Sequence, residues 1–354
     1  MSKRPGEYTY AEILSIPEML RAAVRRAQAK TDAVRQLLGR GFDEVVFVGC
    51  GSSLYLSDSA ASFLRHALDL PARALPASEL VLWPAASLAG AENPLLVAIS
   101  RSGETSETLA AVDAFRRRGR GCVVAVTCSE GGRLADSADV LLSIPEADEQ
   151  SLVMTRSFAA MLMAVEYVAA ALRSPSLAEL LEKVPESIQA AISAHEDDVR
   201  RSALRRDLQR FVFLGGGPFY GAAREGMLKM KEMSLLPAEA FHPLEFRHGP
   251  KAAVDSSVLV VLLASDAGRR VESDLMRELL GMGAAGMTIG PGLQDGLPLE
   301  CAVRIGEGTA EHIRPLCYLP FLDLLGLFKA VDCGRDPDRP VHLDRAIVLK
   351  DMVS

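Results

Sequence analysis

A stretch dense in hydroxyl side chains occupies residues 100–108, with the sequence Ser-Arg-Ser-Gly-Glu-Thr-Ser-Glu-Thr. It follows an apolar run at 95–99 and precedes an amphipathic run at 109–118, an order that predicts a strand, a turn and a helix. The first N–H groups of a helix lack partners and lie at the positive end of its dipole. A phosphate placed there would therefore be bound by main chain and hydroxyls together. The same residues are also typical of a capping box that only starts the helix.

A second unit of strand, glycine turn and helix precedes this one. The β-branched and aromatic run 44–48 ends in the turn Gly49-Cys50-Gly51-Ser52-Ser53 and leads into a small-residue helix. In open α/β sheets ligands bind beyond the carboxyl ends of the strands, which is where both turns fall.

The glycine turns could also suggest a dinucleotide. That fingerprint needs a third glycine, which neither the turn at 49–51 nor Gly215-Gly216-Gly217 has at the required spacing. The hydroxyl-rich sequence favours a monophosphate instead, so we expect no nicotinamide or flavin and no other cofactor.

Glu225, Lys229 and Glu232 follow the spacing i, i+4, i+7, which places all three on one face of a helix. Such a face is usually solvated and salt-bridged. Here the intervening methionines and leucine leave the helix apolar nearly all round, which favours a cleft. A carboxylate beside a lysine in a cleft can act as a general base.

His248 precedes Gly249-Pro250 in a predicted turn, where an imidazole is exposed and can transfer protons near neutral pH. A lone histidine in a turn is also compatible with an ordinary surface position.

Composition narrows the class of protein. The 354 residues are 49% apolar and 24% charged, and 39 basic against 46 acidic residues give a net charge of −7, which argues against a nucleic-acid or anionic-membrane partner. The six cysteines form no CxxC pair, so neither a disulfide framework nor a metal site is expected. No apolar run approaches the roughly 20 residues of a membrane helix, and we expect a cytoplasmic protein that binds a small molecule.

Strands alternate with helices twice along the chain, which predicts an α/β fold with two tandem, doubly wound parallel sheets of flavodoxin type, joined by helices. The expected domains are an N-terminal helical segment (1–35), a phosphate-binding domain (36–175), a helical connector (176–205), a domain carrying the catalytic helix (206–335) and a tail (336–354).

The two halves correspond unit by unit, with 45–53 matching 211–218 and 95–102 matching 258–266. The second half has Asp266 where the first has hydroxyls, and its carboxylate would repel a phosphate. We therefore expect a phosphate only in the first half.

Taken together, the motifs resemble the double-domain form of the sugar isomerase (SIS) family. The closest likeness is to the isomerase half of glucosamine-6-phosphate synthase and to stand-alone relatives that isomerise or deaminate amino-sugar phosphates. The resemblance covers residues 8 to about 349 and rests on these motifs: Glu12-Ile13 with Pro17, Cys50-Gly51-Ser52-Ser53, Ala77-Ser78-Glu79-Leu80, residues 100–105, residues 151–158, residues 225–232, Ala238-Glu239-Ala240 and His248-Gly249-Pro250.

The resemblance implies roles for particular residues. Glu232 would be the base that moves a proton between C1 and C2, His248 would assist ring opening, and Glu225 and Lys229 would orient the base. In the family this histidine reaches the neighbouring subunit's site, which implies a homodimer with shared active sites. The other implied residues bind the phosphate (Ser52, Ser53, Ser100, Arg101, Ser102 and Thr105) or the rest of the substrate (Cys50, Gly51, Leu152 and Arg345).

Three positions depart from the family pattern. Arg101 stands where glutamine is common, and the added charge should tighten phosphate binding. Met154 replaces a small polar residue, as in the stand-alone relatives. Arg345 stands where the family's sugar-binding lysine usually sits, and an arginine cannot form a Schiff base. Either the sugar is held non-covalently, or Lys350 or Lys251 substitutes.

Two functions follow from these residues. The first is an isomerase or deaminase of a hexose or hexosamine 6-phosphate that works through an enediol or enolamine. The second is a non-catalytic sugar-phosphate sensor. Glu232 and His248 favour the enzyme, and Arg345 favours the sensor.

Overall fold

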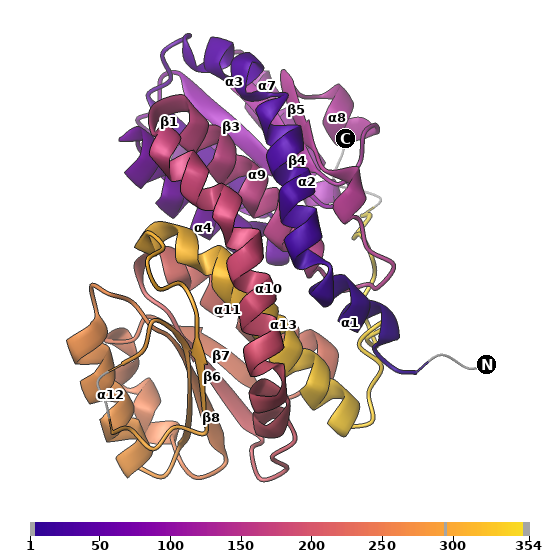
Figure 1. Ribbon diagram of the computed structural model, residues 1–354. Coiled ribbons are helices and arrows are strands. Elements are labelled where there is room, and N and C mark those ends of the chain that lie inside the picture. Colours follow the sequence, from indigo (N-terminus) through magenta and orange to yellow (C-terminus); the bar gives the residue numbers. More distant parts are fainter. Residues whose placement is uncertain (1–3, 294–295, 350–354) are drawn as a thin grey trace. The chain divides into compact units, whose positions relative to one another are not determined.

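The computed structural model describes residues 4–293 and 296–349 (Figure 1). The chain divides into two compact units, each built on its own five-stranded parallel sheet. Among the described residues, the β1–β5 unit comprises 18–149, 156–182 and 344–349, and the β6–β10 unit comprises 4–17, 150–155, 183–293 and 296–343. No helix among the described residues is long and apolar enough to span a membrane.

The β1–β5 unit alternates strands and helices along the chain. Its strands are β1 (Glu44–Gly49), β2 (Ala72–Pro76), β3 (Pro94–Ile99), β4 (Cys122–Thr127) and β5 (Val140–Ser143). Its helices are α3 (Thr31–Leu38), α4 (Ser52–Leu68), α5 (Ala77–Leu82), α6 (Pro84–Ser87), α7 (Ser106–Arg117), α8 (Arg133–Asp136), η1 (Pro145–Ala147) and α9 (Arg156–Arg173); α2 (Ile16–Gln28) and α10 (Pro175–Ala203) each belong partly to this unit.

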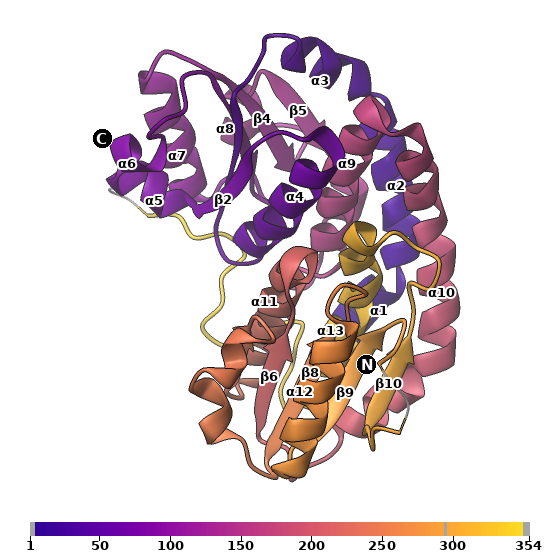
Figure 2. The same ribbon diagram turned by 90° about the vertical axis from the view of Figure 1, so that its left-hand side faces the viewer.

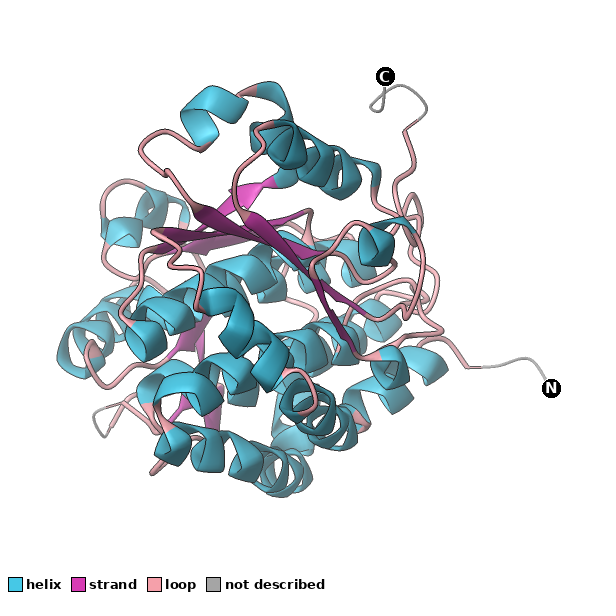
Figure 3. Cartoon of the chain, turned by 90° about the horizontal axis from the view of Figure 1, so that it is seen from above, coloured by secondary structure: helices cyan, strands magenta, loops and turns pink. Residues whose placement is uncertain are grey.

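The strand order in this sheet is β2-β1-β3-β4-β5, so β1 has β2 on one side and β3 on the other. Alternate residues face opposite sides of each strand. Val46 and Val48 belong to a core with α5, α7 and α8, whereas Val45 and Phe47 face α3, α4 and α9. Figure 3 shows helices on both sides of the strands. The sheet therefore reverses its winding between β1 and β3, which is where a ligand crevice opens in such folds.

The β6–β10 unit repeats the design. Its strands are β6 (Arg210–Leu214), β7 (Ala238–Phe241), β8 (Val258–Leu263), β9 (Ala285–Gly290) and β10 (Cys301–Arg304), in the order β10-β9-β8-β6-β7. Its helices are α1 (Glu7–Leu14), η2 (Gly217–Phe219), α11 (Tyr220–Lys229), the π-helical turn η3 (Met230–Ser234), η4 (Glu245–Arg247), η5 (Pro250–Ala253), α12 (Arg269–Gly281), η6 (Glu311–Ile313) and α13 (Arg314–Asp332).

Helices cover both faces of this second sheet as well. Val212 and Leu214 pack in a core with residues of α12, which lies over β8 and β9 in Figure 2. Phe213 faces the other side, where a Cβ at Gly226 of α11 would lie only 2.8 Å from its ring and 3.0 Å from Leu322 of α13. The helix that carries the charged residues therefore packs tightly between the sheet and α13.

Matching glycines let the helical segment that follows the first strand of each sheet approach that strand. A Cβ at Gly49 would lie 2.8 Å from the carbonyl oxygen of Ser53, and one at Gly215 would lie 2.6 Å from that of Phe219. Real Cβ atoms do not come this close to backbone, so glycine is required at both turns. These equivalent contacts support the doubled design expected from the sequence.

The predicted fold class, two tandem α/β sheets with connecting helices, is confirmed. The compact units cut across the expected linear boundaries at both ends of the chain. The expected N-terminal segment is divided at residue 17, because residues 4–17 belong to the β6–β10 unit and 18–35 to the β1–β5 unit. The expected tail is divided at residue 343, because residues 336–343 belong to the β6–β10 unit and 344–349 to the β1–β5 unit. This exchange arises because each terminal segment makes contacts far away in the sequence.

Candidate functional site

The two hydroxyl-rich turns come together at one edge of the β1–β5 sheet. Because β1 and β3 are parallel neighbours, the turns at residues 50–53 and 100–105 both leave the carboxyl ends of adjacent strands. This is the switch point at which doubly wound sheets bind ligands. The structure thus brings together the two segments expected to bind a phosphate.

Hydroxyl groups also hold the shape of the second turn. The Oγ atom of Ser100 lies 3.0 Å from Oγ1 of Thr105 and accepts a hydrogen bond of 3.2 Å from the N–H of Gly103. The Oγ atom of Ser102 accepts one of 3.2 Å from the N–H of Glu104. Gly103 has φ +73°, a value that favours glycine.

The start of α7 follows this turn directly. Its N-cap, Thr105, makes no side-chain capping hydrogen bond. The capping-box alternative is therefore not what the structure shows for Thr105, whose hydroxyl faces Ser100 instead. One helix-start amide, that of Ser106, donates to the carbonyl of Ile347 at 3.1 Å.

The first turn contributes a helix start of its own. Gly51 has φ +55° and precedes Ser52 and Ser53, which are buried in the first turn of α4. Burial raises the pKa of the Cys50 thiol to about 11, so it stays protonated near neutral pH. Cys50 lines the turn as a neutral side chain and is unsuited to act as a nucleophile.

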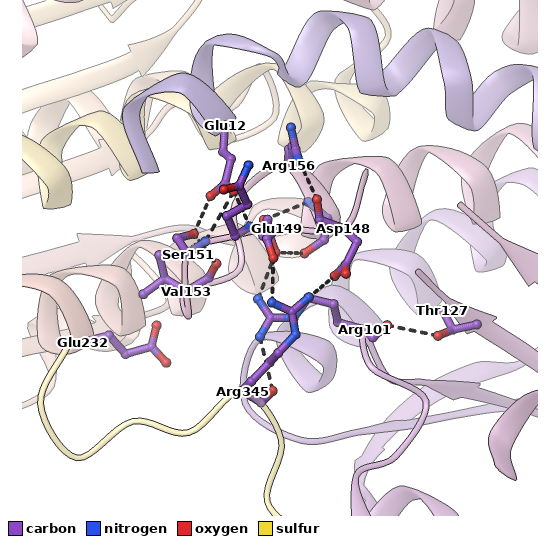
Figure 4. Close-up of polar contacts among 12 residues, drawn as sticks. Glu12, Arg101, Thr127, Asp148, Glu149, Ser151, Val153, Arg156, Glu232 and Arg345 are labelled. Carbon is purple, nitrogen blue, oxygen red and sulfur yellow. Dashed lines mark hydrogen bonds and ion pairs between the residues drawn. The ribbon is translucent and has the colours of Figure 1, made fainter. Parts of the chain in front are cut away.

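In the structure the Arg101 guanidinium pairs with a carboxylate of the protein. Its side chain is 5% exposed, and Nη1 lies 2.9 Å from Oε2 of Glu149, whose side chain is fully buried (Figure 4). The Arg101 carbonyl in turn accepts hydrogen bonds from Thr127 Oγ1 and the Cys128 amide. The charge of this guanidinium is thus neutralised by a buried carboxylate, and the pair helps to fix the turn.

Glu149 is an organising residue that the sequence did not reveal. Besides Arg101 it accepts hydrogen bonds from the N–H of Ser157 at 3.1 Å and from its Oγ at 2.6 Å, at the start of α9. A carboxylate is favoured at a helix N-terminus. It lies directly before residues 151–158, a motif already noted, but nothing in its spacing indicates its partner.

Arg345 is anchored to the same segment. Its Nη1 donates to the Glu149 carbonyl at 2.6 Å and its Nη2 lies 2.5 Å from Asp148, while its own carbonyl accepts a hydrogen bond of 3.2 Å from Arg101. Its guanidinium is thus bound to protein groups, which fits a positioning role for the C-terminal segment.

Two lysines were the expected alternatives to Arg345. Lys251 forms an ion pair of 2.5 Å with Glu278 of α12. Lys350 lies outside the described residues.

The β6–β10 unit contains the expected charged cluster, formed by Glu225, Lys229 and Glu232. The Lys229 ammonium lies 3.3 Å from Oε1 of Glu225 and donates a hydrogen bond of 2.5 Å to Oε2 of Glu232. The side chains of Glu225 and Lys229 are 1% and 0% exposed, whereas that of Glu232 is 17% exposed. Only the Glu232 carboxylate is therefore open to a ligand.

Two features of this cluster could not be predicted from the sequence. The helix changes from α to π geometry at Met230, so Glu232 lies in a π-helical turn, a feature frequent at functional sites. Burial would lower the pKa of Lys229, but the charges of Glu225 and Glu232, with a smaller contribution from Asp323 of α13, raise it. Lys229 therefore stays an ammonium and cannot act as an amine nucleophile near neutral pH.

The remaining predicted residues lie on the surface or in loops. His248 is exposed and follows η4, as expected for a turn. Leu152 is half-buried, and its N–H donates to the carbonyl of Asp338 at 3.1 Å. Glu12 accepts hydrogen bonds from the Gln150 amide at 2.6 Å and from Ser151 (Figure 4), so it fixes the path of this loop.

Comparison with known proteins identifies the family of this chain. The SIS domain model matches residues 42–171. A Streptomyces coelicolor protein, named as a candidate D-galactosamine-6-phosphate deaminase AgaS, is 32% identical over 94% of this chain and 91% of its own length. The chain belongs to the SIS-domain family.

Two further similar proteins differ from this one in their named activities. Tagatose-6-phosphate ketose/aldose isomerase from Escherichia coli has a TM-score of 0.83 at 25% identity, with both chains covered completely. The glutamine–fructose-6-phosphate aminotransferase (isomerizing) of Methanothermobacter thermautotrophicus is 30% identical over 87% of this chain. This chain spans about half the length of that relative, 52%.

In the second sheet of this SIS-family chain, carboxylates of the protein itself accept hydrogen bonds from the turn after β8. The N–H and Oγ of Ser265 donate to the carboxylate of Glu272 at 2.9 and 2.7 Å. The N–H groups of Asp266 and Ala267 donate to Oε1 of Glu311 at 2.6 and 3.2 Å. Internal carboxylates thus occupy the amides that an external anion would need, which agrees with a phosphate site in the first half only.

The buried Arg101–Glu149 pair gives a prediction about stability. Arg101→Gln would leave the Glu149 carboxylate buried without its cation, so we expect a loss of about 3–5 kcal/mol in the free energy of unfolding. Adding Glu149→Gln should restore part of it. Denaturant unfolding measures both variants, with Arg26→Gln as a control that breaks only exposed ion pairs and should cost about 1 kcal/mol or less. A loss for Arg101→Gln no larger than that of the control would contradict this role.

Proposed function

We propose that this chain is an enzyme that moves a proton between C1 and C2 of a hexose or hexosamine 6-phosphate. The observation that carries the proposal is the Glu225–Lys229–Glu232 cluster, because it exposes one carboxylate and buries both the lysine that holds it and the second carboxylate paired with that lysine. A base fixed in this way can approach a substrate carbon without reorganising. The names of the relatives, which include phosphosugar isomerases and deaminases, support the same class.

In the proposed reaction, Glu232 removes the proton from C2 of the open-chain aldose, which gives an enediol, or an enolamine when C2 carries nitrogen. The protonated Glu232 returns the proton to C1 and so forms the ketose. With a 2-amino sugar the same transfer gives an imine at C2, which water hydrolyses to the ketose and ammonia. His248 would open the sugar ring by proton transfer to and from its oxygens.

The phosphate is assigned to the hydroxyls of Ser52, Ser53, Ser100, Ser102 and Thr105. The support is their position at the carboxyl ends of β1 and β3 and the start of two helices. Arg101 is left out of direct contact because it is paired with Glu149.

A sugar-phosphate sensor is the second candidate. It is favoured by Arg345, which cannot form a Schiff base and is bound to Asp148 and to the Glu149 carbonyl. Such a protein would bind the same ligand without turnover.

The phosphate assignment predicts a loss of affinity in one double variant. Each lost hydrogen bond to a charged group is worth about 1.5–3 kcal/mol, so Ser102→Ala with Thr105→Ala should weaken sugar-phosphate binding by roughly 100-fold or more. Calorimetry measures this, with Ser137→Ala as a control on a hydroxyl of the same unit that bonds only the Arg133 carbonyl. Unchanged affinity in the double variant would remove the turn from the proposed site.

Changing the base should separate chemistry from binding. Glu232→Gln keeps the shape of the side chain but removes proton acceptance, so turnover should fall by roughly 10²–10⁴-fold while binding persists. The assay follows ammonia and ketose from a panel of hexose and 2-amino-hexose 6-phosphates. Glu307→Gln, at an exposed loop position, is the control. If Glu232→Gln turned substrate over at the wild-type rate, another base would be needed, and Glu225 would be tested next.

We also propose a homodimer in which His248 acts in the partner's site, since it is exposed on a turn. Light scattering should then give twice the mass of one chain. Mixing His248→Ala chains with Glu232→Gln chains should restore part of the activity, because some sites receive both intact residues. An active monomer would rule out shared sites.

A further inference from the structure

An apolar cavity lies wholly within the β1–β5 unit, between its sheet and the helices α3, α4 and α9. Its volume is about 50 Å³, and every described residue that lines it is Val, Leu, Phe or Ala. The helices α4 and α9, which pack against each other, are seen side by side in Figure 2. A cavity lined by apolar side chains does not stabilise water, whereas it accepts apolar groups. The cavity is therefore suited to part of an apolar ligand.

An open pocket of about 300 Å³ adjoins this cavity, and we call it the mouth. Leu38, Leu68 and Leu172 line both spaces, so the cavity and the mouth meet at these side chains. All three leucines are half-buried, as is Leu70, which also lines the mouth. Water thus reaches apolar side chains at the entrance of an apolar cavity. Covering them with an alkyl chain would remove this apolar surface from water and stabilise the complex.

The mouth is separate from the place assigned to the sugar phosphate. Phe42 precedes β1 and Leu70 precedes β2, so the mouth lies at the amino ends of these parallel strands. The hydroxyl-rich turns leave the carboxyl ends of β1 and β3. The helix α4 begins at the first of those turns and ends at Leu68 in the mouth. Its 17 residues span about 25 Å, so the two places lie at opposite ends of this helix.

Three charged side chains line the mouth: Arg35, Asp69 and Arg173. Arg35 forms an exposed ion pair with Asp32 through one guanidinium nitrogen. Among the described residues, the guanidinium of Arg173 and the carboxylate of Asp69 form no ion pair or hydrogen bond. The lining therefore carries two positive charges against one negative charge. This balance favours an anionic group over a cationic one.

We propose that the mouth and the cavity bind an alkyl carboxylate, with its chain in the cavity and its carboxylate at Arg173 and Arg35. The planar fork of an arginine matches the two oxygens of a carboxylate. A water-sized group needs roughly 10–15 Å³ of such space, so about 50 Å³ has room for roughly four methylene-sized groups. The mouth covers the remainder of the chain. The ligand class is therefore a carboxylate of medium chain length, such as octanoate, and this inference does not depend on the function proposed above.

The first test varies the length of the chain. Calorimetry measures the binding of butanoate, hexanoate and octanoate to the full-length protein. We expect one ligand per chain and an affinity that rises by about fourfold for each additional methylene that is buried. Ala169→Met places three further heavy atoms in the cavity and should weaken octanoate by about tenfold or more, because they take the space of the alkyl chain. Thermal unfolding of this variant checks that it is folded.

The second test varies the charge of the head group and needs no change in the cavity. Octanoate should bind more tightly than octanol, and octanol more tightly than octylamine. Arg173→Gln should weaken octanoate by about two- to fivefold, the range of an exposed ion pair, and leave octanol unchanged. Asp69→Asn should strengthen octanoate by a similar factor, because it removes the opposing charge. Arg117→Gln is the matched control, since Arg117 is also an exposed arginine in the last turn of a helix of this unit.

Several results would overturn the proposal. One is an affinity that does not rise from butanoate to octanoate, and another is the absence of octanoate binding. Octylamine that binds as tightly as octanoate would exclude a carboxylate site. Octanoate binding that neither Ala169→Met nor Arg173→Gln weakens would place the ligand elsewhere. Turnover of sugar phosphates is measured separately, so this inference and the proposed function can fail independently.

Discussion

The buried ammonium of Lys229 is the interaction on which the rest of this account depends. An ammonium taken out of water is costly unless carboxylates surround it closely, and here Glu225 and Glu232 do so at 3.3 and 2.5 Å. The helix that supplies all three is pressed between Phe213 and Leu322, where only glycine fits at residue 226. This packing leaves the ion cluster few alternative arrangements. One carboxylate is directed outward, and the chemistry proposed for the chain follows from that asymmetry.

The doubled fold shows how one architecture serves two purposes. Both sheets wind in the same order and both begin a helix after the third strand in that order, β3 or β8. In the first sheet the turn carries hydroxyls, whereas in the second Glu272 and Glu311 bind the equivalent amides from within the protein. We therefore propose the first sheet, whose turn carries hydroxyls, as the half that binds the substrate phosphate.

The fold and the charged helix could be predicted from the sequence because their signals are local. Alternating apolar runs and glycine turns specify parallel strands, and the spacing of Glu225, Lys229 and Glu232 specifies one helical face. The structure bears out both, although the π-helical turn at Met230 leaves no mark in the residue pattern.

The partners of isolated charges could not be predicted in this way. The resemblance implied phosphate binding for Arg101, but it did not indicate that Glu149, 48 residues away, would pair with it. Asp338 caps the start of α1, 329 residues earlier in the chain. Such pairings depend on which loops the fold brings together, and a single sequence does not carry this information.

Hydrogen exchange at the sugar carbons measures whether Glu232 acts as a base on the substrate. The wild-type protein is mixed in deuterated water with each hexose or hexosamine 6-phosphate that it binds, and deuterium at C1 and C2 is followed by NMR. A carboxylate base that exchanges its proton with solvent should introduce deuterium at one of these carbons, and Glu232→Gln should abolish it. A sugar phosphate that binds tightly but never gains deuterium, across the whole panel, would contradict the enzyme and establish a sensor.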